Sequence, residues 1–469
     1  MALLQACAGT GNPPAESASP EPEKPTAPLA AAPALPAPAP LKTRALADPL
    51  RGVPTIDKTV PPDDLWERVR RGFTMPDLDN ELVREKTAYY AGNREYLQRI
   101  FDRSRLYLFH VVEEIEKRRL PTELALLPMV ESAYNPMAYS RAHASGLWQF
   151  IPGTGRRYEL QQNWWYDGRR DIVDSTAAAL DYLEKLYDMH GDWQLALASY
   201  NWGENAVARA IARNEAAGLP ADYSSLTMPA ETRHYLPKLQ ALKNIIRDPK
   251  AFGIELGPIP NAPYFTTERV RDIDVQLAAK LAEMPVEDFV ALNPGFSRPV
   301  IRASVTPRIV LPADKVDVFR ENLEKHEKAL VSWKTYHPKK GESFESIAKH
   351  HGLAVAQLRE VNGISARTRT PPDLLVVPVD RKASTAVRRL PIMYAPPIPV
   401  ATRRVFHTIK AGETLYSISR RYRVSVEDHK RWNPSTRIQT GRTLAIEQRA
   451  HGKGKPRVQA NSKSRKSAS

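Results

Sequence analysis

The chain has 469 residues, 41 of them proline, and a formal net charge of +15. At roughly 150 residues per domain, this length suggests about three domains, each long enough to bury its own core. The positive charge is compatible with nucleic acid, anionic lipid or a polymer that bears carboxylates and phosphates, and it does not choose among these partners. The uneven distribution of the prolines indicates linkers rather than a fibrous protein. No uninterrupted apolar run reaches the length of a membrane-spanning helix.

Residues 1–61 combine a lipobox-like start with a proline-rich linker. Cys7, the single cysteine of the chain, follows Leu4-Gln5-Ala6 as in bacterial lipoproteins, but the basic and longer apolar segments of a secretory signal do not precede it. Lipidation of Cys7 and a chance match therefore both stay open. One cysteine excludes an intrachain disulfide and a cysteine zinc cluster. From Pro13 to Pro40 there is almost nothing to bury, which is typical of a disordered, semi-extended spacer.

Residues 62–250 follow a helical pattern and are predicted to form a mainly α domain. Within Arg103–Arg118, apolar side chains recur at three-residue steps and form one stripe. Ser175–Met189 predicts another helix, with an N-cap at Asp174 or at its own first residue. Trp193–Asn201 predicts a short apolar helix. No segment of this domain alternates convincingly with period two.

Beyond Pro258 the sequence repeats itself. Phe344–Asn362 aligns with Leu415–Asn433 without a gap, and a Gly-Glu-Ser or Gly-Glu-Thr tripeptide stands just before each. A third stretch, Val275–Asn293, fits the same frame but lacks that tripeptide. Each unit predicts a strand, a tight turn, two short helices that end near an asparagine, and a second strand such as Leu374–Val377. Self-similarity of this kind indicates modular units, which usually serve binding.

The predicted fold class is a mainly α domain followed by small α+β modules of βααβ order. Its parts are a linker at 1–61, the α domain at 62–250, a degenerate module at 262–315, two clear modules at 333–380 and 404–448, and a tail at 449–469. The tail holds lysines and arginines without any acid and is expected to be disordered.

Glu131 is the main catalytic candidate of the α domain. It stands seven residues after Leu124 and four after Leu127, so a helical run places it on the apolar face of its own helix. A carboxyl on that face loses hydration, which raises its pKa toward the value that a general acid needs near neutral pH. From position alone, an ordinary helix end or a pairing with an arginine is the more frequent case.

The surrounding motifs change that balance. Glu131-Ser132-Ala133-Tyr134-Asn135-Pro136 is followed by Gly146-Leu147-Trp148-Gln149-Phe150-Ile151-Pro152. Further along come Tyr166-Asp167-Gly168-Arg169-Arg170-Asp171, Ala198-Ser199-Tyr200-Asn201 and Glu231-Thr232-Arg233-His234-Tyr235. In this order and at this spacing, the motifs resemble the lytic transglycosylase family, and more specifically its membrane-bound lytic murein transglycosylase D type.

The resemblance implies a goose-type-lysozyme-like fold that cleaves the bond between N-acetylmuramic acid and N-acetylglucosamine in peptidoglycan. In this family the muramic acid 6-hydroxyl attacks its own anomeric carbon, which leaves a 1,6-anhydro end without adding water. One glutamate, here Glu131, would act first as acid and then as base, in contrast to the usual plan of two carboxylates. No Asp or Glu stands between Ser132 and Arg157, which is compatible with a single carboxylate, although acids resume at Glu159.

By motif position, the resemblance also assigns the substrate-binding residues Ser140, Gly146, Gln149, Tyr200, Asn201 and Tyr235. Ser140 would hold the reacting group or a nearby water. Gly146 would let the sugar approach the backbone, and Gln149 would both donate to and accept from an N-acetyl group. Tyr200, Asn201 and Tyr235 would form the opposite wall of the sugar cleft. Ordinary core packing is the alternative for the two tyrosines.

The two clear repeats resemble LysM modules, which bind glycans that contain N-acetylglucosamine. The predicted glycan-binding residues stand at the family's Gly-Asp-Thr turn, with a longer acid in each case: Gly341, Glu342, Ser343, Gly412, Glu413 and Thr414. A spacer without affinity is the alternative for these two modules. It is the favoured interpretation for the unit at Val275–Asn293.

Two other classes stay open besides the transglycosylase: a hydrolytic muramidase on the same fold, and a non-catalytic wall-binding protein. Intact Glu131, Ser140 and Gln149 argue against the second class. No nucleic acid partner is expected, because aromatic residues do not accompany the basic tail. No metal or other cofactor is expected, because the histidines lack zinc-ligand spacing. We expect a monomer that binds peptidoglycan glycan strands in the periplasm of a Gram-negative bacterium, anchored to the outer membrane if Cys7 is lipidated.

Overall fold

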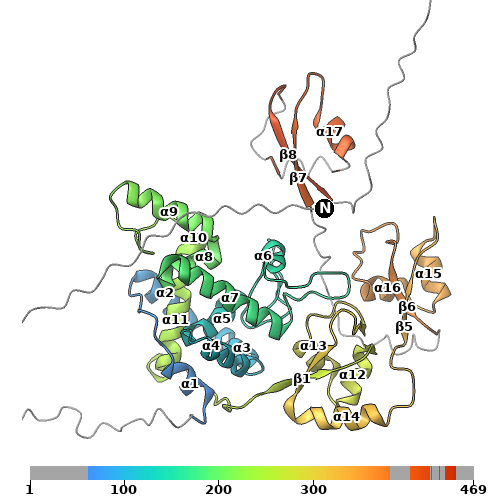
Figure 1. The fold of residues 1–469 in the computed structure, drawn as a ribbon, viewed down its shortest axis with the longest axis horizontal. Coiled ribbons are helices and arrows are strands. Elements are labelled where there is room, and N and C mark those ends of the chain that lie inside the picture. Colours follow the sequence, from blue (N-terminus) through green and yellow to red (C-terminus); the bar gives the residue numbers. More distant parts are fainter. Residues whose placement is uncertain (1–61, 381–401, 423, 425–431, 434–438, 450–469) are drawn as a thin grey trace, which may run out of the picture. The chain divides into compact units, whose positions relative to one another are not determined.

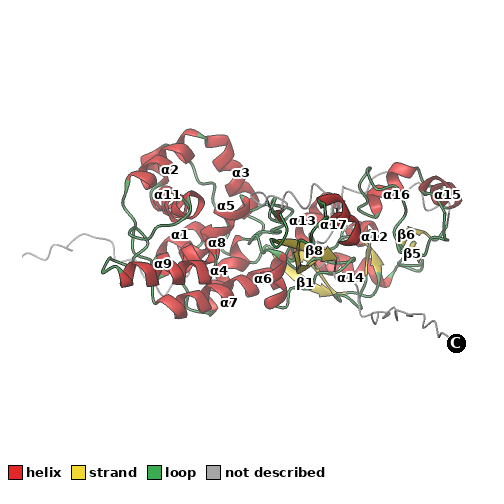
Figure 2. Cartoon of the chain, turned by 90° about the horizontal axis from the view of Figure 1, so that it is seen from above, coloured by secondary structure: helices red, strands yellow, loops and turns green. Residues whose placement is uncertain are grey.

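The computed structural model describes residues 62–380, 402–422, 424, 432–433 and 439–449. It contains a helical domain followed by modules that each hold short antiparallel strands, so the predicted fold class is confirmed (Figure 1). Among the described residues, the strands are confined to the modules, as the colouring by secondary structure shows (Figure 2). Cys7, the whole expected linker and the expected tail lie outside the described residues, apart from residue 449, the first position of the tail. Across the part that is described, no helix combines the length and apolarity needed to cross a bilayer.

The helical domain is built from α-helices and two 3-10 turns. In chain order these are α1 (Leu65–Arg71), α2 (Glu81–Gly92), α3 (Arg94–Ser104), α4 (Leu108–Lys117), η1 (Thr122–Leu126), α5 (Leu127–Ser132), α6 (Pro152–Arg157), α7 (Ile172–His190), α8 (Trp193–Trp202), α9 (Glu204–Ala216), α10 (Ala230–Arg233), α11 (Tyr235–Arg247) and η2 (Pro249–Phe252).

Two predicted helix boundaries were wrong for identifiable reasons. The helix expected to begin near Ser175 begins one turn earlier, because the Asp171 carboxylate accepts the backbone N–H groups of Val173 and Asp174 at 2.9 and 2.7 Å and caps α7 there. The single stripe expected over Arg103–Arg118 is divided between α3 and α4. The break lets Tyr107 bury its ring against Tyr134, the two rings lying parallel with centroids 6.3 Å apart.

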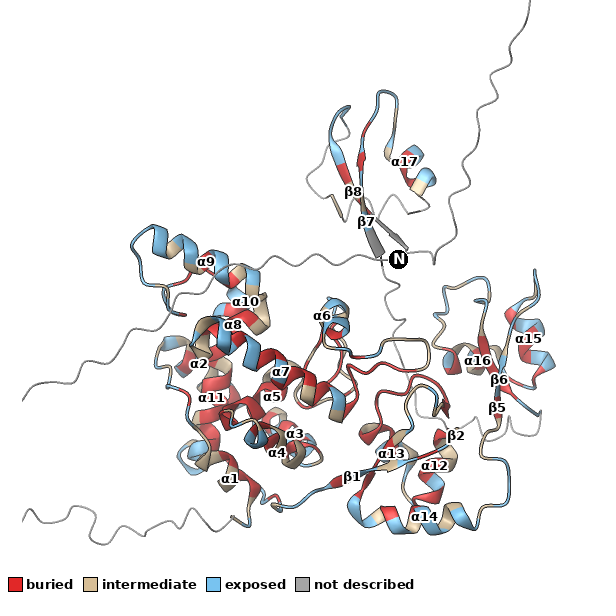
Figure 3. Cartoon of the chain, viewed as in Figure 1, coloured by how far each residue is buried: buried red, intermediate tan, exposed pale blue. Residues whose placement is uncertain are grey.

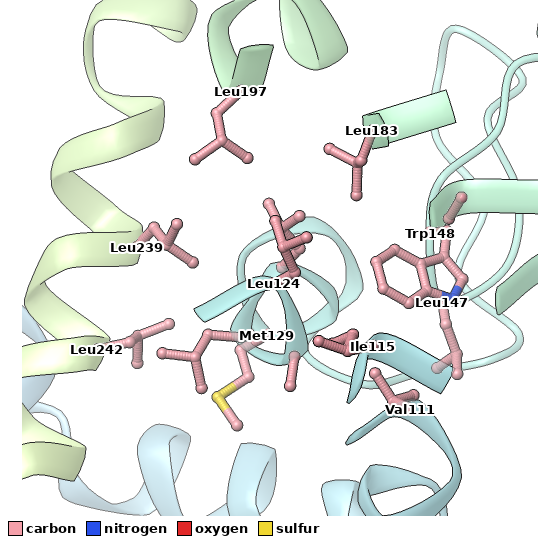
Figure 4. Packing of buried hydrophobic residues seen from close by; sticks show 14 of the residues in the cluster. Val111, Ile115, Leu124, Met129, Leu147, Trp148, Leu183, Leu197, Leu239 and Leu242 are labelled. Carbon is pink, nitrogen blue, oxygen red and sulfur yellow. The ribbon is translucent and has the colours of Figure 1, made fainter. Parts of the chain in front are cut away.

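The core of the domain surrounds the short η1–α5 run. In Figure 4, Leu124 and Met129 of this run lie among side chains from other helices, including Ile115 of α4, Leu183 of α7 and Leu239 of α11. Helices α5 and α11 are therefore largely buried, whereas α9 is mostly exposed (Figure 3). Each fully buried leucine contributes about 1.5–3 kcal/mol. The first half of α5 is thus buried in this core, and its last residues, which are half-buried, stand at the edge of the core.

The first module follows η2 and comprises β1 (Phe265–Arg269), β2 (Ile273–Asp274), α12 (Val275–Leu281), α13 (Val286–Leu292), β3 (Val300–Ile301), β4 (Arg308–Pro312), η3 (Ala313–Lys315) and α14 (Val316–Glu324). Strand β1 pairs with β4 in antiparallel register, from Phe265 opposite Pro312 to Arg269 opposite Arg308. Helix α14 lies beyond the expected boundary at 315, and its Phe319 is fully buried in the core of this module.

The second and third modules repeat this plan. The second consists of β5 (Trp333–Tyr336), α15 (Phe344–His350), α16 (Val355–Val361) and β6 (Leu375–Pro378), and the described part of the third consists of β7 (Thr402–Thr408), α17 (Leu415–Tyr422) and β8 (Thr443–Arg449). Each strand pair is antiparallel. The order strand, helix, helix, strand that the sequence repeat predicted is present in full in the second module.

One asparagine bond is common to all three modules. Asn362 donates from its amide to the carbonyl oxygen of Val376 at 2.9 Å and accepts the backbone N–H of the same residue at 2.6 Å. Asn293 makes the same pair of bonds with Val310, and Asn433 makes it with Ala445. The side chain thus replaces a missing strand neighbour and joins the second helix to the last strand. This bond explains why each repeat ends in asparagine, including the degenerate first one.

Candidate active site

Glu131 lies in the last turn of α5, where the chain leaves the core. The helix ends at Ala133, which has a left-handed φ of 52°, and Tyr134 follows with a φ of 53°. The hydroxyl of Ser132 donates to the carbonyl oxygen of Leu147 at 2.9 Å. The end of α5 is therefore tied to the segment Ser140–Phe150, which we call the active-site loop.

The Glu131 carboxyl accepts a hydrogen bond from the hydroxyl of Tyr235, the first residue of α11. The residue keeps part of its surface accessible, while protein atoms crowd around the carboxyl itself. Burial raises the pKa of Glu131 to about 7, against the opposing effects of the Tyr235 hydrogen bond and the charge of Lys238. At neutral pH the group is therefore divided between its acid and carboxylate forms, as expected from its place on the apolar face.

Tyr200 and Tyr235 both stand close to this carboxyl. Burial raises the pKa of each phenol well above its usual value, and the neighbouring charge of Glu131 adds to the shift in both. The Tyr200 hydroxyl donates to the carbonyl oxygen of Trp148 at 2.8 Å. Trp148 is completely buried and belongs to the core. Three of the predicted residues, one from each of α5, α8 and α11, are thus brought together.

Two amide side chains keep a defined capacity for a ligand. Gln149 donates its amide to the carbonyl oxygens of Gly146 and Ala138 at 2.8 and 3.3 Å, which leaves its own oxygen as an acceptor. Asn201 accepts a hydrogen bond from Thr232 at 2.8 Å, which leaves its NH2 group as a donor. Gln149 was expected both to donate to and to accept from a ligand. Because its NH2 group already donates within the protein, only the acceptor role stays available.

Ser140 and Gly146 lie in the active-site loop. The Ser140 hydroxyl oxygen accepts the backbone N–H of Ala144 at 3.0 Å and so closes a tight turn. Gly146 has a φ of +87°, and a Cβ at this position would lie 2.0 Å from the carbonyl oxygen of Arg169. The structure thus requires glycine for close backbone packing inside the protein. The contact with Arg169 explains why residue 146 is a glycine. That Gly146 also lets a sugar approach the backbone stays a prediction.

The predicted LysM residues form turns and helix caps. Gly341 and Gly412 have φ values of +83° and +79°. The Ser343 hydroxyl accepts the backbone N–H of Ser346 and caps α15, and Thr414 accepts that of Ser417 in the same way. These bonds give each residue a role in the fold, and contact with glycan stays a prediction for them.

The acids of the same turns are also bonded internally. Glu342 accepts the backbone N–H of Lys339 and the hydroxyl of Tyr336, both at 2.9 Å. In the third module Glu413 accepts the corresponding backbone bond from Lys410 and pairs with His407 at 2.7 Å. Beside Gly341, Glu342 and Ser343, the loop at 369–373 completes a hollow of about 530 Å³.

Arg169 is a functional candidate to which the sequence analysis gave no role. Its guanidinium donates to the carbonyl oxygens of His143 and Phe150 at 2.7 and 3.1 Å, and it is paired with Asp167 at 2.7 Å. The motif Tyr166-Asp167-Gly168-Arg169-Arg170-Asp171 was recognised, but its partners lie about twenty residues away. Local sequence therefore gave no sign that Arg169 holds the active-site loop.

These features define a lysozyme-like class of enzyme: a helical domain that buries a carboxyl of raised pKa beside two tyrosines, followed by LysM-type modules. Comparisons agree with this class. The family described as transglycosylase SLT domain matches residues 112–219, the lytic transglycosylase MltD LysM-like domain matches 265–328, and the LysM domain matches 336–371 and 407–447.

Among known proteins, the membrane-bound lytic murein transglycosylase D of Escherichia coli is 31% identical over 400 residues, which cover 82% of this chain and 86% of that protein. A tributyltin chloride resistance protein of Alteromonas is 51% identical over 110 residues, 23% of this chain and 53% of that protein. The solved 70 kDa soluble lytic transglycosylase of Escherichia coli matches 32% of this chain and 24% of its own at 23% identity, and its TM-score of 0.24 carries no argument. The chain belongs to the membrane-bound lytic murein transglycosylase D family.

Proposed function

We propose that this chain cleaves peptidoglycan between N-acetylmuramic acid and N-acetylglucosamine and leaves 1,6-anhydro ends, with Glu131 as the single acid and base. The observation that carries the proposal is the Glu131 carboxyl, whose pKa burial raises to about 7. A group with this pKa can give up a proton and take one back at neutral pH, which efficient general acid–base catalysis requires.

The proposed reaction returns the enzyme to its starting state without water. Protonated Glu131 gives its proton to the glycosidic oxygen as the bond from that oxygen to the muramic acid anomeric carbon breaks. The resulting carboxylate then takes the proton of the muramic acid 6-hydroxyl as its oxygen bonds to the same carbon. Glu131 ends protonated, and the two products together hold the same atoms as the substrate.

The neighbouring polar groups support this cycle in distinct ways. Because burial raises the pKa of Tyr235 far above its usual value, its hydroxyl stays protonated and donates to Glu131 throughout the working range. The Gln149 oxygen offers an acceptor and the Asn201 NH2 group a donor, which match the N–H and the carbonyl oxygen of an N-acetyl group. Ser140 can donate its hydroxyl proton, since its oxygen already accepts from Ala144.

A hydrolytic muramidase on the same fold would need a second carboxylate to activate water. Glu231 is the acid whose charge acts on Glu131, but it is exposed at the start of α10. Membership of the transglycosylase family disfavours this alternative, and it equally disfavours a non-catalytic wall-binding protein.

The second module contributes wall affinity in this proposal. Its hollow beside Gly341, Glu342 and Ser343 has a volume of about 530 Å³, and the loop at 369–373 supplies the other wall. Pockets of 300–1,000 Å³ suit small ligands of the size of one or two sugars. The third module shares the turn at Gly412, Glu413 and Thr414 and is proposed to bind in the same manner.

The family places the chain in the cell envelope. We further propose the finer location and organisation: the periplasm of a Gram-negative bacterium, an outer-membrane anchor on lipidated Cys7, and a monomeric chain. The proposed parts are the linker at 1–61, the catalytic domain at 62–250, the first module from 262 through α14, and LysM modules at 333–380 and 404–448.

Digestion of purified sacculi with mass analysis of the products tests the function. Wild-type protein should release muropeptides that end in 1,6-anhydro-N-acetylmuramic acid, and Glu131→Gln should release them about 10²- to 10⁴-fold more slowly while still binding sacculi. Reducing ends that disappear in Glu231→Gln would instead establish the hydrolytic alternative. Products from Glu131→Gln at the wild-type rate would remove the assignment.

A further inference from the structure

One short segment of the catalytic domain is enclosed between the active-site loop and the first module. This segment, Tyr166–Asp171, precedes α7 and is buried along its whole length. We call it the linking segment. On one side it contacts residues 143–150, and on the other side it contacts residues 295–308 of the first module.

Toward the active-site loop, the linking segment acts through Arg169. Its guanidinium donates to the carbonyl oxygens of His143 and Phe150, and its own backbone carbonyl packs against Gly146. The Asp167 carboxylate holds the same guanidinium through two hydrogen bonds of 2.9 and 2.7 Å. Asp167 thus fixes the Arg169 guanidinium through Nε and Nη2, and the remaining Nη1 binds two carbonyl oxygens of the active-site loop.

The two carbonyl oxygens that Arg169 binds belong to His143, which has a strained backbone, and to Phe150, which follows strained Gln149. His143 has a φ of 64° and Gln149, the residue before Phe150, has a φ of 51°. For residues with a Cβ, a left-handed conformation costs of order 1–3 kcal/mol and persists only where the surroundings enforce it. The bonds from Arg169 supply that enforcement at both strained positions, so the place of Gln149 depends on Arg169.

Toward the first module, the linking segment forms part of a shared structure. The Asp167 backbone N–H donates to the carbonyl oxygen of Gly295 at 2.8 Å, and Tyr166 lies opposite Phe296 in an antiparallel bridge. The Tyr166 ring belongs to the core of the module and touches Gly295, where a Cβ would lie 2.6 Å from the ring. Backbone and core are therefore continuous across this contact.

Charged groups complete the contact. Arg308 of β4 donates to Asp171 at 2.8 Å and lies 3.0 Å from the Asp174 carboxylate. The Arg170 guanidinium, completely enclosed, donates to the Ser297 hydroxyl at 2.8 Å. Removal of the Arg308 guanidinium would leave the carboxylates of Asp171 and Asp174 without their positive partner. The module thus supplies groups that the linking segment cannot replace from within the catalytic domain.

We propose that the first module acts as a positioning element of the catalytic domain, which holds the active-site loop in its strained conformation through the linking segment. In this proposal, the surface of the module that faces the linking segment serves to position the active-site loop. The module retains the asparagine bond of its repeats but lacks their Gly-Glu-Ser/Thr turn. Residues Arg308, Ser297 and Gly295 are positioning residues, since they act on the site through Arg169.

Charge reversal at Arg308 tests the proposal in the full-length chain, with Arg320→Glu as the matched control. Arg320 lies in the same module, exposed and paired with Glu268, away from the linking segment. Hydrogen exchange should increase at residues 138–150 in Arg308→Glu and stay unchanged there in Arg320→Glu. The lysis rate at saturating sacculi should fall about 10- to 100-fold in Arg308→Glu, because misplacement of binding groups by about 1 Å has effects of this size. Sacculus binding should be unchanged in both variants.

The exchange measurement does not depend on the proposed function, whereas the lysis rate does. If wild-type protein lacked lytic activity, the proposed function would fail, and the exchange at 138–150 would still decide whether the module holds the loop. Increased exchange at 295–310 without any increase at 138–150 would overturn the inference. Should Arg308→Glu fail to fold, Gly295→Ala serves as the milder variant, because its Cβ displaces the Tyr166 ring. A second result would also overturn the inference. It is a Gly295→Ala protein in which exchange at 165–171 is raised, while exchange at 138–150 and the lysis rate both stay at the wild-type values.

Discussion

Two glutamates of the same short run have opposite environments. Glu123 in η1 is 1% exposed, pairs with Lys243 at 2.8 Å and accepts the backbone N–H groups of Thr74 and Met75 at 3.1 and 2.9 Å. Glu131 in α5 has a tyrosine hydroxyl as its hydrogen-bond donor, and burial raises its pKa to about 7. Both carboxyls are enclosed by one core, yet Glu123 faces an ammonium and two backbone amides, whereas Glu131 faces a neutral hydroxyl.

The difference shows that burial alone does not make a catalytic acid. Glu123 is bound by an ammonium and two backbone amides, whereas at Glu131 the hydrogen bond from Tyr235 only partly opposes the effect of burial on the pKa. Glu123 therefore serves the fold, because it connects η1 to α11 and to the segment before α2. Glu131 is the residue to which we assign the chemistry. Substitution of either residue, or of its partners, tests this division of roles.

The largest effect is expected for the rate of wall lysis in Glu131→Gln. The amide keeps the shape of the side chain but has no acidic proton, so the rate should fall about 10²- to 10⁴-fold, the range typical of a general acid–base. Turbidity loss of purified sacculi measures it. Glu231→Gln is the control and should stay within about threefold of wild type, since Glu231 is exposed. A greater loss in the control than in Glu131→Gln would reverse the assignment.

A large effect on stability is expected for Lys243→Met. This change leaves Glu123 without its ammonium in a buried site and should lower the free energy of unfolding by about 3–5 kcal/mol. Arg247→Met removes the exposed pair with Asp77 and should cost about 0–1 kcal/mol. Denaturant titrations at pH 7 measure both. Equal losses in the two variants would mean that Glu123 does not depend on Lys243.

A smaller, pH-dependent effect should distinguish the stability of Glu131→Gln from that of wild type. The folded protein holds the Glu131 proton up to a pKa of about 7, whereas an unfolded chain releases it near the ordinary value of 4.5. Wild-type stability from this group is therefore lost as pH rises from about 4.5 to about 7. The glutamine variant should match wild type at pH 4 and exceed it by about 1–3 kcal/mol at pH 8. A constant difference across this range would contradict the raised pKa.

The smallest effect is expected for Tyr235→Phe. The Tyr235 hydrogen bond lowers the pKa of Glu131, so its loss should move the alkaline limb of the lysis profile upward by about 0.5–1 pH unit. Tyr200→Phe is the matched control, since its hydroxyl donates to the Trp148 carbonyl oxygen instead. A downward shift in Tyr235→Phe would show that the hydroxyl favours the protonated carboxyl.

Much of this molecule could be predicted from sequence because the signals are local. The spacing of Glu131 from Leu124 and Leu127 predicted a poorly hydrated carboxyl, and the raised pKa agrees with it. The alignment of the repeats gave Asn293 and Asn362 equivalent positions although the first module is degenerate. The two side chains make equivalent hydrogen bonds.

The rest depends on partners that are distant in sequence. Nothing near Arg169 indicated that it holds His143 and Phe150, and nothing near Arg308 indicated a contact with Asp171, 137 residues away. The start of α7 was predicted one turn late because Asp171 and Asp174 are equally good caps by residue type. Only the tertiary contact that fixes Asp171 distinguishes them.

The bond between Glu131 and Tyr235 joins residues 104 positions apart. Tyr235 begins α11, the last long helix of the catalytic domain, so the carboxyl acquires its enclosure only when this helix has docked. Before that step, an emerging or partly unfolded chain carries an ordinary acid that is ionised at neutral pH. Completion of the core and the rise in the pKa of Glu131 are thus one event, so a chain in which α11 has not docked lacks the partly protonated carboxyl to which we assign the cleavage.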